Sequence, residues 1–369
     1  MRHAIRLVQQ GQGSMVSLFD SSVPEPTELL RQTVADAFGE TLTPRYASAF
    51  VSGNPYVVAA LGRHYGVSSA SILCTTGATG ALSLIYKSLL KPGERVLVER
   101  PGFDLFGSLA EAAGLGVDHF DRPAPEYRLD LDSIIARLTP QTRMIVLSNL
   151  HNPSGMVIPP AELDAFAEIA EHHDLLCVID EVYRDYAPDQ VAGPYGATVS
   201  DRFISISSMT KIFGLATLRC GWLIGDPSLI QRVRAVSDAT EFGISNLAHS
   251  VAALVLEKPE PFVQYWQSML AASRPVVEHY HRQWVEDGLV EGRLPDHGCI
   301  AFLRLPHIAD TLAFADQLCR ERGIAVAPGE YFGSPGHIRI GFGKGVSSLD
   351  RGLSLITAEL KNASETVAG

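Results

Sequence analysis

The chain has 369 residues, of which 46% are hydrophobic and 19% are charged. This balance is that of a folded globular protein, and the length favours one large α/β domain with a smaller second domain. The formal net charge of −11 argues against a nucleic-acid partner, because binding a phosphate backbone requires clustered Lys and Arg side chains.

The N-terminal sequence and the cysteines bear on the compartment. The segment MRHAIRLVQQGQGSM lacks the apolar stretch of a signal peptide, and no segment is apolar for long enough to cross a bilayer. The five cysteines show neither a C-x-x-C pair nor a metal-like spacing with histidine, so we expect reduced core cysteines and no metal site. We therefore expect a soluble, cytoplasmic protein without a membrane partner.

Residues 1–40 are predicted to form an N-terminal arm and a helix that contribute to a small domain. Prolines punctuate VSLFDSSVPEP, and TELLRQTVADAF then repeats apolar residues at helical spacing. The arm is expected to pack against another part of the protein.

Residues 41–258 are predicted to form a large domain. Helical segments such as GALSLIYKSLL and PAELDAFAEIAEHH alternate with short, continuously apolar segments. This alternation is typical of an α/β fold whose mostly parallel sheet is buried on both faces. The strands are predicted in ILCTT, RVLVER, TRMIVLSN, LLCVIDE and RFISISS.

Residues 259–369 are predicted to form a smaller α+β domain. A long helical segment from Pro261 is followed by IAFLRL, TLAFADQLCRERG and HIRIGFG, a mixture of strand-like and helix-like patterns. The final ASETVAG is expected to be frayed.

The segment SSMTKIFGLATLRCG carries the strongest chemical signal. It follows the predicted strand RFISI and places Ser208, Lys211 and Arg219 around one transition from strand to loop. A lysine amine becomes a nucleophile when burial or a nearby cation destabilises its ammonium form, and pyridoxal 5′-phosphate (PLP) chemistry requires such an amine. An isolated lysine is more often a solvated surface residue, but the surrounding motifs favour the catalytic interpretation of Lys211.

The segment VIDEVYRDY ends a strongly apolar strand with two acidic residues, Asp180 and Glu181. Ligand sites of open α/β sheets lie beyond the carboxyl ends of the strands. Asp180 is expected to hold the protonated ring nitrogen of PLP through a charge-assisted hydrogen bond of about 1.5–3 kcal/mol. The alternative is that Asp180 caps a following helix.

Two further loops carry weaker signals. In CTTGATGALSLIY, backbone amides near Ala78 and Thr79 open a helix and are suited to a phosphate, although such turns often serve chain geometry alone. In SNLHNPSG, Asn152 is placed to donate its amide to the phenolic oxygen of the cofactor, and an ordinary Asn-Pro turn is the alternative.

The motifs HNPSG, DEVY, SMTK and LRCG occur in the order and approximate spacing of class I/II aminotransferases, the aspartate aminotransferase-like family of PLP fold type I. The chain resembles this family over nearly its whole length. The resemblance implies a large domain with a mostly parallel, seven-stranded sheet flanked by helices, a smaller α+β domain, and PLP as the cofactor. It also implies that Lys211 is the Schiff-base lysine.

The resemblance assigns roles to the other motif residues. Asp180 pairs with the ring nitrogen, and Asn152 and Tyr183 contact the phenolic oxygen; Lys211, Asp180 and Tyr183 are the catalytic set. The residues implied to hold the phosphate are Gly77, Ala78, Thr79, Ser208 and Arg219.

Three more residues are implied with alternatives. Phe103 is expected to stack on the pyridine ring, although core packing is the commoner role of a phenylalanine. Tyr46 is expected to reach the phosphate of the neighbouring subunit. Arg339, with Asn152 beside it in the substrate site, is expected to grip the substrate carboxylate at two points, and a surface arginine on an edge strand is the alternative.

The sequence departs from the family pattern at several positions. Leu150 stands where the family usually has a proline before the Asn-Pro pair, and Cys299 stands where glycine is common. The arm sequence DSSVPEP differs more strongly, and the arm contributes to substrate binding in this family. The identity of the amino donor therefore does not follow from the resemblance.

Three hypotheses for function follow. The first is transamination between an amino acid and a 2-oxo acid through a Lys211 aldimine. The second keeps the same cofactor and fold but ends in elimination, cyclisation, decarboxylation or oxidation of an amino acid, for example in secondary metabolism. The third is a PLP-sensing regulator, which the acidic composition and the lack of a DNA-binding segment before the arm disfavour. A homodimer with shared active sites is expected.

Overall fold

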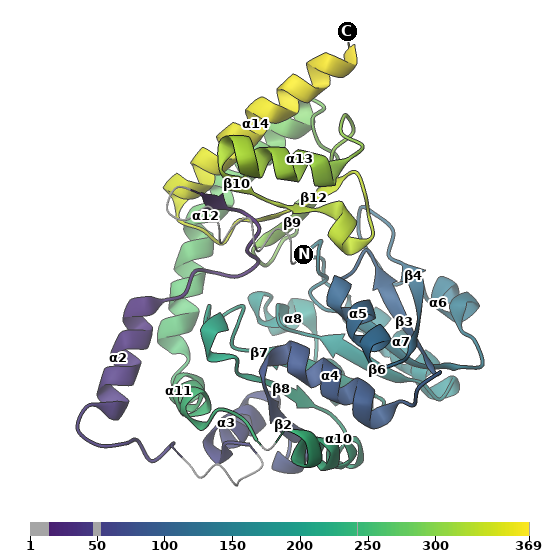
Figure 1. Ribbon diagram of the computed structural model, residues 1–369, viewed down its shortest axis with the longest axis vertical. Coiled ribbons are helices and arrows are strands. Elements are labelled where there is room, and N and C mark those ends of the chain that lie inside the picture. Colours follow the sequence, from purple (N-terminus) through teal and green to yellow (C-terminus); the bar gives the residue numbers. More distant parts are fainter. Residues whose placement is uncertain (1–14, 47–52, 242, 369) are drawn as a thin grey trace.

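The computed structural model describes residues 15–46, 53–241 and 243–368 (Figure 1). The segment before residue 15, in which a signal peptide was not expected, and most of the segment ASAFVSGNP after Tyr46 lie outside the described residues. Within the described residues, no helix combines the length and the apolar character that a membrane span requires.

A seven-stranded sheet forms the centre of the larger part, in the order β2-β8-β7-β6-β5-β3-β4. Neighbouring strands are parallel except at β8, which is antiparallel to both β2 and β7. The predicted α/β class with a mostly parallel, seven-stranded sheet is confirmed. The strands are β2 (Ile72–Thr75), β3 (Arg95–Arg100), β4 (Gly116–Asp121), β5 (Thr142–Ser148), β6 (Leu176–Asp180), β7 (Phe203–Ser208) and β8 (Gly221–Ile224).

Helices cover both faces of this sheet. Successive strand residues point to opposite faces, so each strand contributes side chains to both cores. In β3, Val96 and Val98 pack into the core beneath α4, whereas Leu97 packs into the core beneath α7. Continuous apolar strands are therefore needed, as predicted. The helices of this part are α3 (Pro55–Tyr65), α4 (Gly77–Leu89), α5 (Asp104–Ala112), α6 (Leu131–Arg137), α7 (Pro160–His172), α8 (Asp189–Ala192), α9 (Gly196–Val199), α10 (Pro227–Thr240) and α11 (Asn246–Glu257).

The register of the parallel strands aligns their polar ends. Ser148, the last residue of β5, lies beside Asp180, the last residue of β6. Asp180 in turn lies beside Ile206, two residues before the end of β7. The loops that follow β5, β6 and β7 consequently leave the sheet at one edge, which is where ligands bind in open α/β sheets.

The smaller part has a three-stranded antiparallel sheet in the order β11-β12-β9. The N-terminal arm joins it, because β1 pairs in parallel with β10 and the amide of Gly341 donates to the carbonyl of Leu18. Figure 1 shows this part above the large sheet, and α12 extends from beside α11 up into it. Its strands and helices, with the arm and α2, are β1 (Val16–Ser17), α2 (Thr27–Phe38), α12 (Glu260–Glu286), β9 (Ile300–Arg304), α13 (Thr311–Gln317), β10 (Ile324–Ala325), β11 (Ala327–Pro328), β12 (His337–Gly341) and α14 (Val346–Ala368).

Two details differ from the sequence analysis. The segment ASETVAG is not frayed as a whole, because α14 continues to Ala368. Strands β4 and β8 were not predicted: β4 (GVDHFD) lies at an edge of the sheet and is only partly buried, and β8 (GWLI) is short. All five cysteines are free and buried, as predicted.

Candidate active site

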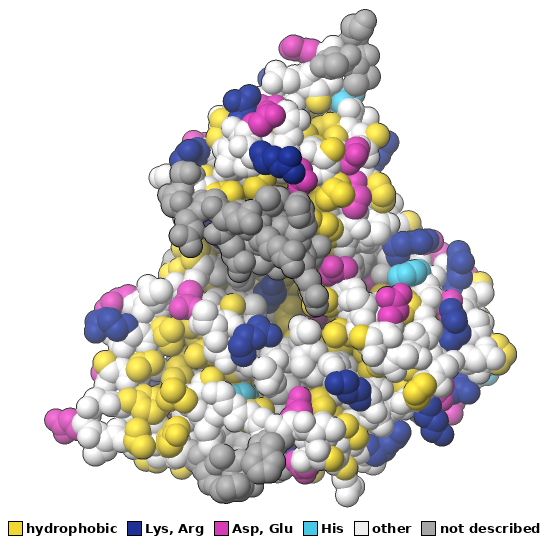
Figure 2. Space-filling model, in the orientation of Figure 1, with side chains coloured by type: hydrophobic (Ala, Val, Ile, Leu, Met, Phe, Trp, Pro, Cys, Tyr) yellow, Lys and Arg dark blue, Asp and Glu magenta, His cyan; other side chains and the backbone are white. Residues whose placement is uncertain are grey.

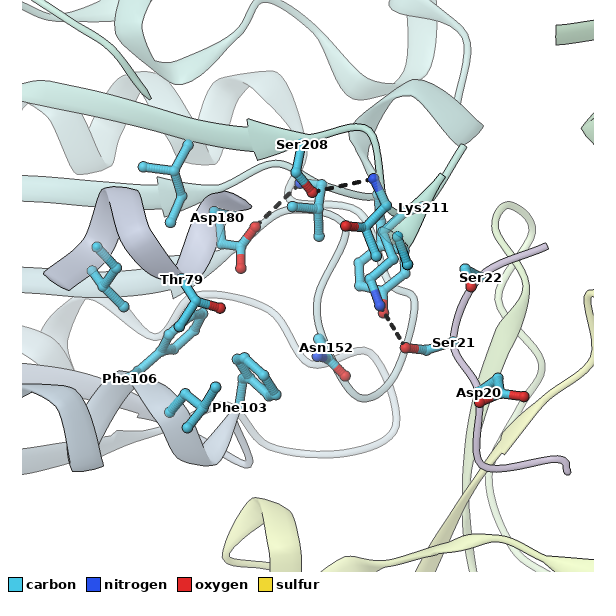
Figure 3. Close-up of a pocket in the computed structure, with 18 of the residues that line it drawn as sticks. Asp20, Ser21, Ser22, Thr79, Phe103, Phe106, Asn152, Asp180, Ser208 and Lys211 are labelled. Atoms are coloured by element: carbon cyan, nitrogen blue, oxygen red, sulfur yellow. Dashed lines mark hydrogen bonds between the residues drawn. The ribbon is translucent and has the colours of Figure 1, made fainter. Parts of the chain in front are cut away.

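A pocket opens at the carboxyl ends of β5, β6 and β7, between the large sheet on one side and the arm and β12 on the other (Figure 3). Figure 2 shows the corresponding face of the protein hollowed between its upper and lower parts. The predicted site residues that line this pocket are Ala78, Thr79, Phe103, Asn152, Asp180, Tyr183, Ser208, Lys211, Arg219 and Arg339.

The first turn of α4 forms the anion-binding end of the pocket. Gly77 begins the helix with a φ of +75°, a conformation that side chains other than glycine rarely adopt. Its Cα is covered by Arg219, because a Cβ placed there would lie 2.6 Å from the Arg219 Nη2 atom. Ala78, Thr79 and Ser208 line the pocket beside this guanidinium. Free amides at a helix N-terminus, an arginine and a hydroxyl together suit a phosphate.

Asp180 ends β6 and is 8% exposed. Burial raises the pKa of its carboxyl to about 6, although the amide of Val182 and the charge of Lys211 oppose the shift. One carboxylate oxygen accepts a hydrogen bond from the Val182 amide at 3.2 Å, which is a local turn contact. The capping alternative is wrong, because the next helical turn begins at Arg184 and has no side-chain cap. The carboxylate also lines the pocket, where a cationic partner would favour its charged form.

Lys211 lies on the turn that follows β7, and the Tyr186 hydroxyl holds its backbone carbonyl at 2.9 Å. The Nζ atom donates a hydrogen bond to the Ser21 hydroxyl at 2.8 Å and lies 5.1 Å from the centre of the Tyr183 ring. Lys211 is thus a half-buried lysine aimed into a pocket, not a solvated surface lysine.

Arg339 on β12 is buried, with 2% exposure, which excludes the alternative of a surface arginine. Its Nη1 atom donates to Asn152 Oδ1 at 3.0 Å, and its Nη2 atom donates to the carbonyl of Phe19 at 2.8 Å. Asn152 therefore has a role beyond an Asn-Pro turn. Burial lowers the pKa of the Arg339 guanidinium, and nearby acidic groups oppose this shift.

Two polar atoms at the pocket are buried without a partner among the described residues. These are the hydroxyl of Tyr183 and the Nε atom of Arg339. Buried polar atoms are almost always hydrogen-bonded, so each indicates a ligand group that it would contact. Phe103 also lines the pocket and meets Phe106 edge to face, with 5.7 Å between ring centres.

Tyr46 does not lie in the pocket of its own chain. It follows α2 at the surface and is 46% exposed. The preceding residue is anchored to α11 through an ion pair of 2.9 Å between Arg45 and Glu257. The predicted role of Tyr46 concerns a neighbouring subunit and stays a prediction.

The arm supplies residues that the sequence analysis did not single out, namely Phe19, Asp20, Ser21 and Ser22. Figure 3 shows Ser21 opposite Asn152, on the far side of the pocket from Asp180. Asp20 forms an ion pair of 2.6 Å with Lys344. The signal for these residues in the sequence was the polar run DSS within an otherwise apolar and proline-rich arm. The contact of Ser21 with Lys211 depends on how the arm packs and could not be predicted.

The sequence matches the family described as aminotransferase class I and II over residues 50–356. Among curated proteins, the chain is 29% identical to an arginine–pyruvate transaminase of Pseudomonas aeruginosa, over 80% of this chain and 76% of that protein. It is 28% identical to a capreomycidine synthase of Streptomyces vinaceus, over 78% of this chain and 74% of that protein.

Solved structures share the fold over nearly the whole chain. A PLP-dependent aminotransferase from Streptococcus suis superimposes with a TM-score of 0.85, covers 97% of both chains and is 24% identical. An aspartate aminotransferase of Thermus thermophilus superimposes with a TM-score of 0.82, covers 97% of this chain and 94% of that chain, and is 23% identical. At these identities the likeness bears on the fold alone.

Proposed function

The chain belongs to the aminotransferase class I and II family and is a PLP-dependent transferase that acts on amino acids and 2-oxo acids, and we propose that Lys211 is the residue through which it works. The predictions of family, cofactor and aminotransferase activity are thereby confirmed. The observation that carries the proposal is the convergence of Lys211, Asp180 and Arg339 on one pocket.

The residues present fit the cofactor. The first turn of α4 with Arg219 suits its phosphate, and the buried carboxylate of Asp180 suits a cationic ring nitrogen. The unpartnered hydroxyl of Tyr183 and the amide of Asn152 suit its phenolic oxygen, and Phe103 offers an aromatic face. When bound, PLP supplies an aldehyde that takes up the amino group and a ring that stores the electrons of a broken bond at the substrate Cα.

The chain's own residues bind the substrate, orient it and transfer its proton. Arg339 binds the substrate carboxylate through a planar guanidinium, a geometry that a lysine does not offer. Asn152 accepts from Arg339 and so fixes the orientation of that guanidinium. The ε-amino group of Lys211 would take up the proton of the substrate Cα and release it again, as a general base and then a general acid.

We further propose that the arm residues contact the side chain of the amino donor and select the donor. Asp20, Ser21 and Ser22 offer a carboxylate and two hydroxyls at the pocket. A donor with a hydrogen-bonding side chain fits the two hydroxyls, whereas the charge of Asp20 is already paired with Lys344 at 2.6 Å. The relative named arginine–pyruvate transaminase supports a basic donor.

A panel of amino acids tests this function directly. The purified, PLP-loaded protein is mixed with each amino acid, and the absorbance of the cofactor and the product mass are followed together. We expect bleaching with basic amino acids and a product in which the amino group is replaced by a carbonyl. A panel in which no amino acid produces a 2-oxo acid would contradict the proposal.

A second outcome has one supporting observation, the similarity to the capreomycidine synthase of Streptomyces vinaceus. The same residues would then serve a different fate of the substrate, such as elimination or cyclisation. The mass measurement separates the two outcomes, because a product that retains its amino nitrogen excludes simple transfer.

Three expectations complete the proposal. Residues 1–40 and 259–369 form a small domain with the arm, and residues 41–258 form the large domain; the separate sheets support this division. The chain forms a homodimer in which Tyr46 reaches the partner's cofactor, supported by exposed apolar side chains at Leu42 and Leu247 near Tyr46 and α11. A cytoplasmic location is supported by free cysteines, which suit a reducing compartment.

A further inference from the structure

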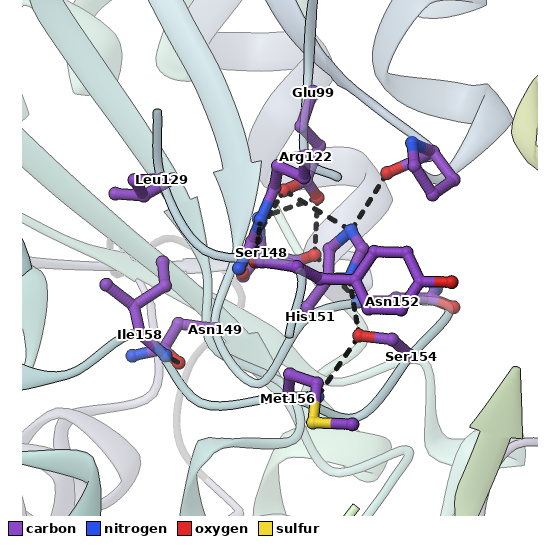
Figure 4. Close-up of polar contacts among 12 residues, drawn as sticks. Glu99, Arg122, Leu129, Ser148, Asn149, His151, Asn152, Ser154, Met156 and Ile158 are labelled. Atoms are coloured by element: carbon purple, nitrogen blue, oxygen red, sulfur yellow. Dashed lines mark hydrogen bonds and ion pairs between the residues drawn. The ribbon is translucent and has the colours of Figure 1, made fainter. Parts of the chain in front are cut away.

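A buried ion pair lies beneath the loop that carries Asn152 (Figure 4). Glu99 is near the end of β3, and Arg122 directly follows β4. Their side chains are fully buried, and the Nη1 atom of Arg122 lies 2.7 Å from Glu99 Oε2. Burying two charges removes their hydration, and apolar side chains of similar size would often fill such a position at lower cost. The pair therefore calls for an explanation other than stability.

The carboxylate of Glu99 is connected to the backbone of Asn152 through one residue. Its Oε1 atom accepts hydrogen bonds from both the amide of Ser148, at 2.9 Å, and the hydroxyl of Ser148, at 2.5 Å. The Ser148 hydroxyl in turn accepts from the amide of Asn152 at 2.9 Å. Burial raises the pKa of the Glu99 carboxyl to about 7, and the charge of Arg122 and the two hydrogen bonds from Ser148 oppose this shift by favouring the charged form.

Arg122 holds the same loop from the other side. Its Nη1 atom donates to the carbonyl of Ser148 at 3.2 Å, and its Nε atom donates to the carbonyl of Tyr127 at 2.7 Å. The ring of His151 continues the network, with Nε2 2.8 Å from the carbonyl of Pro101. Burial lowers the pKa of His151 well below its usual value, which keeps the ring neutral.

The network ends at Asn152 and Arg339, whose side chains line the pocket. The Oδ1 atom of Asn152 accepts from Arg339, which leaves the amide nitrogen of Asn152 as the donor for the pocket. A shift of the Asn152 backbone would move this donor and release one hydrogen bond of Arg339. Both consequences rest on the function proposed above for these two residues.

We propose that Glu99 and Arg122 are positioning residues of the active site: through Ser148 they fix the backbone of Asn152, and thereby set both its hydrogen bond to the cofactor's phenolic oxygen and the orientation of Arg339. Neither residue touches the pocket. Their effect on the reaction is transmitted by hydrogen bonds along the loop.

This role has a spectroscopic signature that a merely structural pair would lack. A hydrogen bond donated to an ionisable group favours its ionised form. Displacing Asn152 removes such a donor from the phenolic oxygen, so the pH at which the absorbance of the bound cofactor changes should rise. Because Arg339 loses a partner as well, the KM for the amino acid should rise by more than kcat falls.

The test compares Glu99→Gln with Asn152→Ala and with the double variant, all loaded with PLP. We expect Glu99→Gln to raise the absorbance midpoint by about half a pH unit or more, and to produce no further rise when Asn152 is already alanine. The control is Asp118→Asn, which breaks the ion pair between Arg95, at the start of β3, and Asp118 in β4, and should leave the midpoint unchanged. Ser148→Ala removes the hydroxyl that links Glu99 to Asn152 but retains the ion pair, and we expect it to raise the midpoint as well. It replaces Glu99→Gln in the test if that variant does not fold.

The outcomes separate this inference from the proposed function. If Asn152→Ala shifts the midpoint but Glu99→Gln and Ser148→Ala do not, the positioning role is wrong while the role of Asn152 stands. Equal shifts from Glu99→Gln with and without Asn152 would also overturn it. If Asn152→Ala leaves the midpoint unchanged, the proposed role of Asn152 is wrong, and the positioning role with it.

Discussion

The hydroxyl of Ser21 is the arm's direct contact with the lysine amine, at 2.8 Å from Lys211 Nζ. Ser21→Ala removes this acceptor and leaves the amine less well oriented toward the substrate. A hydrogen bond of this kind contributes about 0.5–1.5 kcal/mol, so we expect kcat to fall by roughly 3- to 10-fold. Steady-state kinetics check this, with Ser17→Ala as the matched control on the same arm, because Ser17 does not line the pocket. A fall in kcat of equal size in both variants would contradict a specific role for Ser21.

The raised pKa of Asp180 predicts that cofactor binding depends on pH. Burial raises the pKa of its carboxyl from 3.8 to about 6, so below pH 6 the group is protonated and cannot pair with a cationic ring nitrogen. The same shift stabilises the cofactor-free protein at low pH, and this contribution is lost as the pH rises through about 6. We expect the Kd for PLP to rise by roughly tenfold per unit below pH 6.

Fluorescence titration of the cofactor-free protein between pH 5 and 8 measures this dependence. Asp180→Asn provides the baseline, because it cannot ionise and any remaining trend belongs to the cofactor itself. Profiles of the same slope in the original protein and in Asp180→Asn would mean that Asp180 does not hold the ring nitrogen.

At the scale of single residues, the sequence predicted those that follow strands. Asp180 ends β6, and Asn152 and Lys211 follow β5 and β7 within four residues; the carboxyl ends of parallel strands meet at one edge. Ser21 and Glu99 could not be found this way. Ser21 reaches Lys211 across a separation of 190 residues, and the charge of Glu99 is explained only by the partner that β4 delivers beside it.

At the scale of elements, the start of α4 is the most constrained position of the site. Gly77→Ala would place a Cβ 2.6 Å from Arg219 Nη2 and force a side chain into a φ of +75°. The backbone conformation alone costs about 1–2 kcal/mol. We expect a lower melting temperature and a Kd for PLP that is raised by roughly tenfold or more.

The matched control is Gly80→Ala in the same helix, where a Cβ would meet only the Thr76 side chain at an ordinary 3.5 Å. Calorimetry and cofactor titration of both variants check the prediction. If Gly80→Ala weakened cofactor binding as much as Gly77→Ala, the close approach of Arg219 would not be what the glycine serves.

The predictability of each element depended on its burial. The strands β3, β5, β6 and β7 were predicted because both their faces are covered, and the helices α2 and α7 because one face is apolar. The edge strand β4 has polar residues at several positions, and the antiparallel β8 pairs across a long loop, so neither carried a clear pattern. The end of α14 lacks apolar spacing and was expected to fray, but the helix continues.

At the scale of the whole molecule, Tyr46 is the residue that we propose to link the active site with a second subunit. We propose a homodimer in which the Tyr46 of each subunit contacts the cofactor of the other, since Tyr46 is exposed and outside its own pocket. Tyr46→Phe should weaken PLP binding while light scattering still gives a dimer. Mixing Tyr46→Phe with Lys211→Ala should restore one complete site per heterodimer, because that site takes Lys211 from one chain and Tyr46 from the other.

Recovery of transferase activity on mixing checks the shared site. An active monomer, or mixtures no more active than the sum of the separate variants, would contradict it. The sequence could predict this arrangement only by resemblance, because an exposed tyrosine in a single chain has no recognisable pattern of its own.

The account as a whole depends on the amine of Lys211. The most direct measurement is borohydride reduction of the PLP-loaded protein, followed by digestion and mass spectrometry of the peptides. We predict that the mass of the reduced cofactor is found on the peptide that contains Lys211, and that Lys211→Ala retains no cofactor after reduction. Cofactor fixed to a different lysine, or to none, would contradict the central claim.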